Sequence, residues 1–432
     1  MPSLAVRNFG CRVNQAEAFA WTEALLEEGV RLDADWSRSD IVLVNSCTLT
    51  GRTDRDVRKF IRKVARDNPA ARLVVTGCYA ERAPAEVAAL PGVAAVLPNA
   101  AKDRLPRRVL EFIGGNGNGA RAVRPERPVR DPGGDRGPED ALRKRAFLKI
   151  QDGCDNRCAF CVIPAVRGRS VSVRPEDVRA RVGDLTSRGF REIVLVGIHL
   201  SSYGADLSPR GSLPGLLREL GSVPGLGRIR LSSLDPRKTD GGLVETITAD
   251  PKVCPHFHVS LQHASERVLR LMGRAGGPEM YARTLEELRR RAPDAALGAD
   301  IIVGFPGETE DDFRELRSFL ERSPLTYFHV FTFSPRPATP AAERPHLPNG
   351  VVRDRAVDLR RLSAEKGLRF RELFLGRELE AVVIQNAGRG AEVLTANNIR
   401  VRVPSCRAPE REFVRVRVSR VLPGRTEGEV SP

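Results

Sequence analysis

A run of three closely spaced cysteines constrains this chain more than any other feature of its sequence. Residues 153–161 read Gly-Cys-Asp-Asn-Arg-Cys-Ala-Phe-Cys. Thiolates with this three-then-two spacing can bind three irons of a cubic [4Fe–4S] cluster from one loop, whereas tetrahedral zinc sites need four closed ligands. The alternatives are a zinc knuckle or a cluster of reduced surface thiols. We therefore expect Cys154, Cys158 and Cys161 to bind a cluster whose fourth iron stays open to chelate a substrate.

The composition indicates a globular protein of several domains with a polyanionic partner. At 432 residues the chain exceeds one ordinary core, so we expect about two to four domains. No stretch approaches the roughly 20 apolar residues of a membrane helix, and the first residues lack a secretory signal. We therefore expect a cytoplasmic protein with no membrane partner. A net charge of +15 favours nucleic acid as the partner, although a compositional bias toward arginine is the alternative.

Residues 1–113 alternate short apolar runs with helical patterns, which predicts an open α/β domain. Residues 41–45 and 72–76 are typical of buried parallel strands. Three cysteines each follow an expected strand, namely Cys11, Cys47 and Cys78. Because parallel strands end at one edge of a sheet, the three thiols can converge there. One cysteine after a strand is most often a small buried hydrophobic residue, but three equivalent positions favour a second metal-cluster site.

The rest of the chain predicts a linker and a central barrel. Residues 114–143 are rich in glycine, proline and arginine and cannot bury a core, so we expect a linker there. In residues 144–374 a strand-helix rhythm repeats six times, which predicts a partial (β/α)6 parallel barrel with the cysteine loop at its carboxyl-terminal mouth. The expected strands are 147–151, 192–196, 228–232, 257–261, 299–303 and 327–333.

The last segment, residues 375–432, switches to an alternation of period two. This pattern predicts a small antiparallel β-barrel. Valines alternate there with arginines, which gives one apolar and one cationic face. The arginines are Arg400, Arg402, Arg415, Arg417 and Arg420. A basic β surface suits an RNA-binding module, and protection of edge strands by positive charge is the alternative.

These domains together resemble the methylthiotransferase branch of the radical S-adenosylmethionine (SAM) enzymes. The resemblance covers almost the whole chain and includes stretches at expected strand ends, which are residues 197–204, 230–236, 260–262 and 300–309. It implies that the barrel cysteines bind the cluster that cleaves SAM. It also implies that the three N-terminal cysteines bind an auxiliary [4Fe–4S] cluster, and that a terminal domain of the TRAM type binds RNA. The residues that we expect to contact SAM are Phe160, Gly197, Ser232, Ser233, Gln262 and Val303.

Residues 10–15, Gly-Cys-Arg-Val-Asn-Gln, resemble the subgroup that acts on N6-threonylcarbamoyladenosine in tRNA. We therefore expect methylthiolation at C2 of that nucleoside, at position 37, by a monomeric enzyme with an electron donor such as flavodoxin or ferredoxin. The alternatives are isopentenyladenosine in tRNA and a ribosomal protein, the second disfavoured by the basic terminal domain. Two positions depart from the subgroup: Asp235 replaces a glutamate, and residues 262–265 read Gln-His-Ala-Ser.

The chemistry that the resemblance implies needs a radical. Replacing the C2 hydrogen of adenine breaks an aromatic C–H bond, and acid–base catalysis contributes only about 10²–10⁴-fold. A cofactor must therefore carry this step. Two three-cysteine sets also count against a non-catalytic electron carrier or RNA-binding scaffold, because electron carriers usually close all four iron positions. We assign no catalytic role to His199, His256, His258 and His263 or to the remaining thiols, Cys254 and Cys406.

Overall fold

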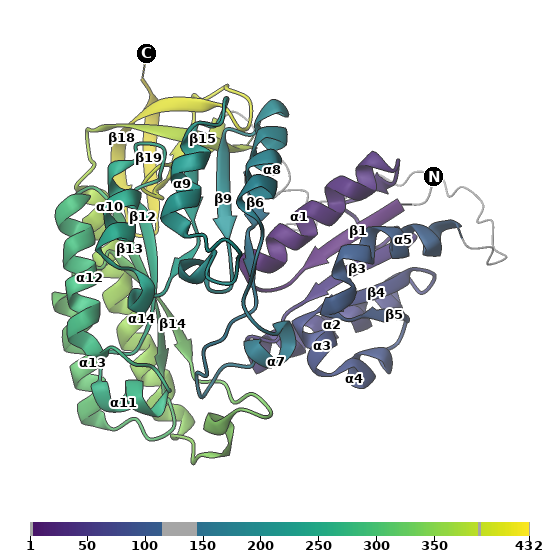
Figure 1. Ribbon diagram of the computed structural model, residues 1–432, viewed down its shortest axis with the longest axis horizontal. Helices are drawn as coiled ribbons and strands as arrows, with labels where there is room; N and C mark the ends of the chain where they lie inside the picture. The colour runs from purple at the N-terminus through teal and green to yellow at the C-terminus, as the bar shows by residue number, and fades with distance from the viewer. Residues whose placement is uncertain (1–2, 115–144, 388–389, 432) are drawn as a thin grey trace. The chain divides into compact units, whose positions relative to one another are not determined.

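The chain forms two compact units, within residues 1–142 and 143–432 (Figure 1). The computed structural model describes residues 3–114, 145–387 and 390–431. The predicted linker, residues 114–143, lies outside the described residues except for Gly114, which ends a helix. The four-part division of the chain into domains stays a prediction.

The N-terminal unit is a parallel sheet covered by helices on both faces, as the sequence predicts. The strand order is β2-β1-β3-β4-β5, and each neighbouring pair is parallel. Helices α2, α3 and α4 pack on one face, and α1 and α5 pack on the other. The strands are β1 (Ser3–Asn8), β2 (Arg31–Leu32), β3 (Ile41–Ser46), β4 (Arg72–Gly77) and β5 (Val93–Leu97). The helices are α1 (Arg12–Glu27), α2 (Gly51–Asp67), α3 (Cys78–Arg82), α4 (Pro84–Ala88), the 3₁₀ helix η1 (Asn99–Arg104) and α5 (Leu105–Gly114).

Helix α2 shows how the sequence builds this unit. Thr50 caps the first turn, where its side chain accepts a hydrogen bond from the Thr53 amide. Val57, Ile61 and Val64 recur at helical spacing and are fully buried against the sheet. The opposite face is exposed and carries Arg52, Arg55, Lys59, Arg62, Lys63 and Arg66. One helix thus buries an apolar stripe and presents a cationic one.

The second unit begins with a row of parallel strands that confirms the predicted barrel strands. β6, β9 and β10 form one sheet, and β11, β12, β13 and β14 form the next. Ser232 separates β10 from β11, so these two short strands occupy the third predicted position. The strands are β6 (Ala146–Lys149), β9 (Glu192–Val196), β10 (Arg228–Leu231), β11 (Ser233–Leu234), β12 (His256–Gln262), β13 (Ala296–Val303) and β14 (Tyr327–Thr332).

Helices follow these strands, and a small hairpin supports the cysteine loop. β7 (Gln151–Asp152) pairs antiparallel with β8 (Val171–Ser172). The α-helices are α7 (Ile163–Arg167), α8 (Pro175–Ser187), α9 (Leu213–Gly221), α10 (Gly241–Ala249), α11 (Glu266–Leu271), α12 (Gly277–Arg291), α13 (Glu310–Arg322) and α14 (Asn349–Glu372). The 3₁₀ helices are η2 (Leu200–Ser202), η3 (Pro236–Lys238) and η4 (Pro340–Glu343).

The C-terminal barrel is closed but mixed, which corrects the expectation of a purely antiparallel one. Its order is β15-β16-β17-β19-β18, and β17 pairs parallel with β19. A closed ring of five strands cannot alternate direction throughout, so one neighbouring pair must be parallel. The strands are β15 (Glu378–Ala387), β16 (Gly390–Thr395), β17 (Arg400–Val403), β18 (Phe413–Leu422) and β19 (Arg425–Val430). The five arginines singled out above are all exposed, while valines between them are buried.

A buried ionic layer joins this barrel to the amino ends of the parallel strands. Glu192, at the start of β9, accepts hydrogen bonds from Arg228 Nε (2.6 Å) and Arg230 Nε (3.0 Å). Arg228 also donates to the Leu394 carbonyl, and Arg230 donates to the Thr395 carbonyl. Burial alone would raise the pKa of Glu192, but the neighbouring guanidinium groups hold it well below its usual range. The carboxylate is therefore ionised and fully paired.

Removing the charge of Glu192 should destabilise the second unit. We expect Glu192→Gln to cost about 3–5 kcal/mol at pH 7, because two buried guanidinium groups lose their counter-charge. The difference from wild type should shrink as the pH falls below the unfolded value of 4.5, since the contribution of a carboxyl with a lowered folded pKa is lost on acidification. Urea unfolding followed by circular dichroism measures both effects. Glu287→Gln, at an exposed carboxylate on α12, is the control, and an equal shift in both variants would contradict the role of the ionic layer.

Candidate active site

The three barrel cysteines lie on one loop between β7 and α7, beyond the carboxyl end of the first parallel strand. Two backbone hydrogen bonds hold this loop. The Cys154 amide donates to the Gly168 carbonyl (3.1 Å), and the Ala159 amide donates to the Met272 carbonyl (2.9 Å). All three thiols are half-buried and none is in a disulfide. The loop therefore presents three sulfur ligands from a fixed backbone.

Burial controls the protonation of two of these thiols. It raises the pKa of Cys161 to about 12, and it also raises the pKa of Cys154. Both groups are therefore thiols at neutral pH until a bound cation deprotonates them. A thiol with a raised pKa is a poor nucleophile, so this environment suits metal ligation better than covalent catalysis.

The spacing of the cysteines fits a polynuclear cluster. Among the residues that the structure describes, the metal-ligating side chains with all ligand atoms within 4.8 Å of one another are His258, Asp300 and His329. Neither cysteine set is gathered that closely, whereas thiolates around one zinc ion lie about 3.8 Å apart. A cubic cluster holds its thiolates farther apart. The sulfur donors and their spacing therefore fit three irons of a [4Fe–4S] cluster.

The N-terminal thiols lie at the carboxyl ends of three neighbouring parallel strands, at the edge that the sequence predicts. Cys11 follows β1 and precedes α1, Cys47 follows β3, and Cys78 begins α3 directly after β4. Cys47 and Cys78 are buried, and Cys11 is half-buried. The fold thus brings three residues from distant parts of the sequence to one end of the sheet.

Short contacts fix the backbone around these thiols. Gly10 has a positive φ of 98° and lies so close to Cys47 that a Cβ atom there would be 2.3 Å from its Sγ. Asn14 joins two strand ends by donating to the carbonyls of Phe9 (2.9 Å) and Ser46 (3.0 Å). The glycine and asparagine of the Gly-Cys-Arg-Val-Asn-Gln motif therefore shape the loop that carries its cysteine.

The residues expected to contact SAM all lie near the carboxyl ends of the second unit's strands. Phe160 packs edge-on against Phe305, with ring centroids 6.4 Å apart. The Gly197 amide donates to Ser232 Oγ (3.3 Å), which joins the ends of β9 and β10. The side chain of Val303 is fully buried, so only its backbone can contact a ligand. The remaining two are Ser233 in β11 and Gln262, which ends β12 with a φ of 74°.

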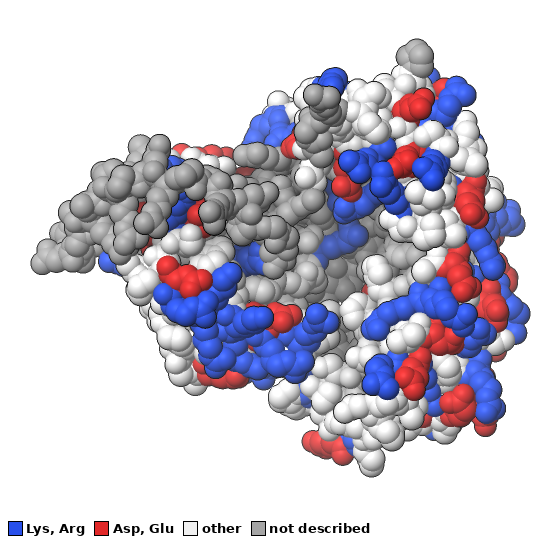
Figure 2. Space-filling model, turned by 180° about the vertical axis from the view of Figure 1, so that it is seen from behind, with Lys and Arg blue, Asp and Glu red and all other residues white. Residues whose placement is uncertain are grey.

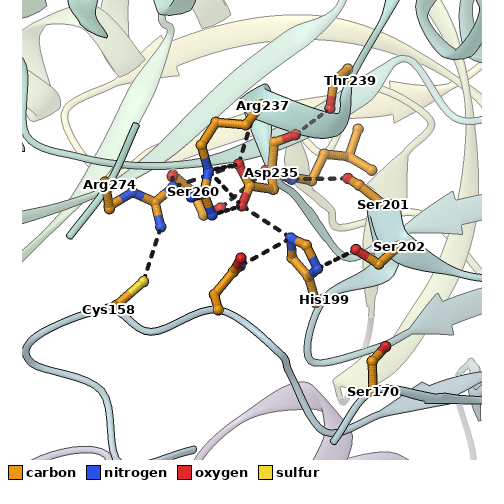
Figure 3. Close-up of polar contacts among 12 residues, drawn as sticks. Cys158, Ser170, His199, Ser201, Ser202, Asp235, Arg237, Thr239, Ser260 and Arg274 are labelled. Carbon is orange, nitrogen blue, oxygen red and sulfur yellow. Dashed lines mark hydrogen bonds and ion pairs between the residues drawn. The ribbon is translucent and has the colours of Figure 1, made fainter. Parts of the chain in front are cut away.

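A buried carboxylate, Asp235, organises the polar groups beside the cysteine loop (Figure 3). Its oxygens accept hydrogen bonds from Arg237 Nε (3.0 Å) and pair with His199 Nε2 (3.0 Å). Arg274 Nη2 lies 3.7 Å from the same carboxylate. Burial alone would raise the pKa of Asp235, but hydrogen bonds from His199 and Arg237 and the charges of both arginines hold it well below its usual range. The aspartate that departs from the subgroup pattern is therefore ionised and fully engaged.

Arg274 connects this carboxylate to the cysteine loop, and sequence reasoning missed it. Its Nη1 lies 3.9 Å from Cys158 Sγ, and its Nη2 donates to the Ser260 carbonyl (2.5 Å). The side chain is buried, and its Nε has no hydrogen-bond partner among the described residues. A buried cation with an unpaired donor beside a cysteine of the loop fits an anionic ligand. One arginine in a chain this rich in arginine gives no sequence signal.

The cysteine loop is also tied to the segment after β9 by Gln151, the first residue of β7. Its side-chain oxygen accepts a hydrogen bond from the His199 amide (2.8 Å). Its nitrogen donates to the Gly153 carbonyl (2.9 Å). Asn156, within the loop, contacts His199 Nε2 at 3.4 Å. His199 therefore contacts both the loop and Asp235, a structural role that agrees with assigning it no catalytic one.

Comparison with known proteins finds a matching family model in each of the two units. A model of the radical SAM superfamily matches residues 148–320, and a model described as uncharacterized protein family UPF0004 matches residues 3–98. The threonylcarbamoyladenosine tRNA methylthiotransferase MtaB of Aquifex aeolicus is 36% identical over 92% of this chain and 96% of its own. The ribosomal protein uS12 methylthiotransferase RimO of Saccharopolyspora erythraea is 36% identical over 78% and 75%. The tRNA-2-methylthio-N(6)-dimethylallyladenosine synthase of Cereibacter sphaeroides is 33% identical over 99% and 98%.

Solved structures support the fold. The radical SAM methyltransferase TsrM from Kitasatospora setae, with a SAM analogue bound, superposes with a TM-score of 0.55 at 17% identity. The match covers 79% of this chain and 75% of that one, and at this identity it shows the fold alone. None of the described helices is long and apolar enough to cross a membrane.

The matches also imply cofactors. The radical SAM superfamily uses a [4Fe–4S] cluster and SAM, and the N-terminal family match implies a second cluster. The cysteine loop and the N-terminal sheet edge supply the sulfur donors that two such clusters need. With near-complete coverage of relatives at 33–36% identity, the chain belongs to the methylthiotransferase family of radical SAM enzymes.

Proposed function

We propose that this enzyme adds a methylthio group to C2 of N6-threonylcarbamoyladenosine at position 37 of tRNA. The observation that carries the proposal is the match to four MtaB relatives, at 32–36% identity over 79–92% of the chain. The Gly-Cys-Arg-Val-Asn-Gln motif supports the same substrate. Relatives that act on a dimethylallyladenosine and on a ribosomal protein are nearly as similar, so the substrate needs a direct test.

In this proposal each part of the site has a distinct task. Cys154, Cys158 and Cys161 hold the radical cluster, and the three N-terminal cysteines hold the auxiliary one. When bound, the clusters and SAM supply the electron, the carbon radical and the sulfur that methylthiolation consumes. Asp235 and His199 keep Arg274 beside Cys158, where its guanidinium group can bind the SAM carboxylate. Phe160 offers an apolar ring for the SAM adenine.

Exposed cations support an RNA substrate. Figure 2 shows that lysine and arginine outnumber carboxylates over much of the face that it draws. On the C-terminal barrel, Arg402, Arg415 and Arg420 are exposed and have no ion pair with the described residues. Unpaired arginines on a β surface can bind a phosphate backbone without desolvating an existing partner. A flavodoxin or ferredoxin donor and a monomeric enzyme stay predictions.

Mutations in the two cysteine sets should have different effects on SAM cleavage and on methylthiolation. We expect Cys154→Ala to lose both SAM cleavage and methylthiolation, because the radical cluster loses a ligand. Cys11→Ala should keep SAM cleavage and lose methylthiolation. Anaerobic reconstitution with dithionite, followed by assays of 5′-deoxyadenosine, methylthio product and iron content, measures this. Cys406→Ala, outside both sets, is the control. Full methylthiolation by Cys11→Ala would remove that residue from the auxiliary site.

Arg274 should raise the reduction potential of the radical cluster. Hydrogen bonds to cluster sulfurs raise reduction potentials, so we expect Arg274→Met to lower the midpoint potential and weaken SAM binding. A redox titration followed by electron paramagnetic resonance measures the potential. Arg270→Met is the matched control, because Arg270 lies on α11, is 70% exposed and forms an ion pair with Glu266. An unchanged potential in Arg274→Met would contradict the role of the Cys158 contact.

The substrate is tested by deleting the gene and analysing tRNA nucleosides by mass spectrometry. We expect the methylthio form of N6-threonylcarbamoyladenosine to disappear and its unthiolated precursor to accumulate. Complementation with the wild-type gene should restore the product, whereas the Cys154→Ala gene should not. Loss of a methylthio-isopentenyl nucleoside, or an altered mass of a ribosomal protein, would replace the proposed substrate with one of the alternatives.

A further inference from the structure

The inner face of the parallel strands carries polar residues below the cysteine loop. Side chains alternate along a strand, so Asp300 shares a face of β13 with Ile302. Ile302 packs against the same buried apolar cluster as Ala159 and Phe160 of the loop, so this face of β13 runs toward the loop. On the opposite face Ile301 is fully buried, while Asp300 and Ile302 are partly exposed. The inner face is therefore accessible to a ligand.

Three neighbouring strands each contribute one residue to this polar group. His258 lies on β12, four residues before Gln262, and His329 lies on β14, four residues before Phe333. At about 3.3 Å per residue, the group lies roughly 10–13 Å below the strand ends that border the cysteine loop. We call His258, Asp300 and His329 the His-Asp-His group. It lies between the ionic layer at the amino ends and the cysteines at the carboxyl ends.

Hydrogen bonds fix this group from one side. Asp300 Oδ1 lies 3.1 Å from His258 Nε2 and 3.2 Å from His329 Nδ1. The other nitrogen of His258, Nδ1, contacts the Tyr327 hydroxyl at 3.2 Å, and that hydroxyl also contacts His256 Nε2 at 2.7 Å. Tyr327 and His256 thus support the group from the amino-end side. The support leaves little freedom for the Asp300 carboxylate.

Two polar atoms of the group stay open. Asp300 Oδ2 and His329 Nε2 have no hydrogen-bond partner among the described residues. The His329 side chain is 56% exposed, and that of Asp300 is 25% exposed. Burial alone would raise the pKa of Asp300, but the facing histidines hold it well below its usual range, so Oδ2 is a charged acceptor. An acceptor and an imidazole nitrogen therefore stand side by side on an accessible inner face.

We propose that the His-Asp-His group is the subsite that binds the polar N6 substituent of the substrate nucleoside, an inference that rests on the proposed function. A threonylcarbamoyl group offers N–H and hydroxyl donors, which Asp300 Oδ2 can accept and which His329 Nε2 can also accept while its Nδ1–H donates to Asp300 Oδ1. An isopentenyl group offers none of these. Binding it here would leave Asp300 Oδ2 desolvated without a partner, which disfavours that substrate.

The magnitude of the expected discrimination follows from the polar character of the site. A hydrophobic pocket separates substrates that differ by a methylene group only about 10–200-fold, whereas a site built to hydrogen-bond a substrate group rejects analogues that lack it by about 10⁴–10⁵-fold.

The same three residues could in principle bind a divalent cation. Hydrogen bonds to Asp300 and Tyr327 already engage both nitrogens of His258, and one nitrogen of His329 is bound to Asp300, so only His329 Nε2 and Asp300 Oδ2 stay open, which favours the substrate subsite.

The test uses the reconstituted full chain and two stem-loop RNAs that differ only in the N6 substituent of the target adenosine, threonylcarbamoyl or isopentenyl. His329→Phe keeps the ring and removes its nitrogens at an exposed position, and Asp300→Asn replaces the acceptor with little change of shape. We expect each variant to lose at least tenfold in kcat/KM on the threonylcarbamoyl RNA, so that its preference for this RNA over the isopentenyl RNA falls by the same factor. Iron content and RNA-independent cleavage of SAM should stay as in wild type.

His346→Phe makes the same change at another exposed histidine and should leave every readout unchanged. If wild type modifies the threonylcarbamoyl RNA and both variants do so equally well, only this inference fails. An equal loss on both RNAs would also overturn it, as would one equivalent of zinc or iron beyond the clusters that disappears in His329→Phe. If wild type leaves the threonylcarbamoyl RNA unmodified, the proposed function itself fails, which is seen before any variant is measured.

Discussion

The constraint on which the rest of this structure depends is the parallel direction of neighbouring strands. Parallel strands end together, so residues that follow them in sequence meet at one edge. In the N-terminal unit this brings Cys11, Cys47 and Cys78 to the ends of β1, β3 and β4. In the second unit it gathers the cysteine loop, Ser232 and Gln262. Two sites built on the same principle are what a reaction with two cofactor clusters requires.

At the amino ends of the parallel strands, the second unit has a buried ionic layer. Glu192 accepts hydrogen bonds from Arg228 and Arg230, and the arginines also donate to carbonyls of the C-terminal barrel. A buried carboxylate with two guanidinium partners contributes little net stability over an apolar layer, but removing one partner is costly. The layer therefore fixes the position of the terminal barrel on the strands rather than adding greatly to stability.

Periodicity and spacing predicted the elements well because local sequence determines them. The apolar run in residues 41–45 and the helical stripe of Val57, Ile61 and Val64 each appear where expected. The meeting of the N-terminal cysteines at one edge of the sheet was also predictable, because it follows from the strand assignments alone. The parallel pair β17 and β19 was not, because it follows from ring closure rather than from any local pattern. Asp235, His199 and Arg274 come from three separate segments, so their meeting depends on the tertiary fold.

Polar side chains at the amino ends of the parallel strands have more hydrogen-bond partners than those in the middle of the strands. At the amino ends Glu192 is fully buried and matched by arginines. In the middle, Asp300 has one oxygen bound by two imidazoles and the other open, and His329 is more than half exposed. Water can solvate the open Asp300 oxygen and the exposed His329 nitrogen in the free enzyme, so the fold needs no internal partner for either. A ligand that excludes this water has to replace its hydrogen bonds, and the polar N6 substituent in our proposal carries the donors to do so.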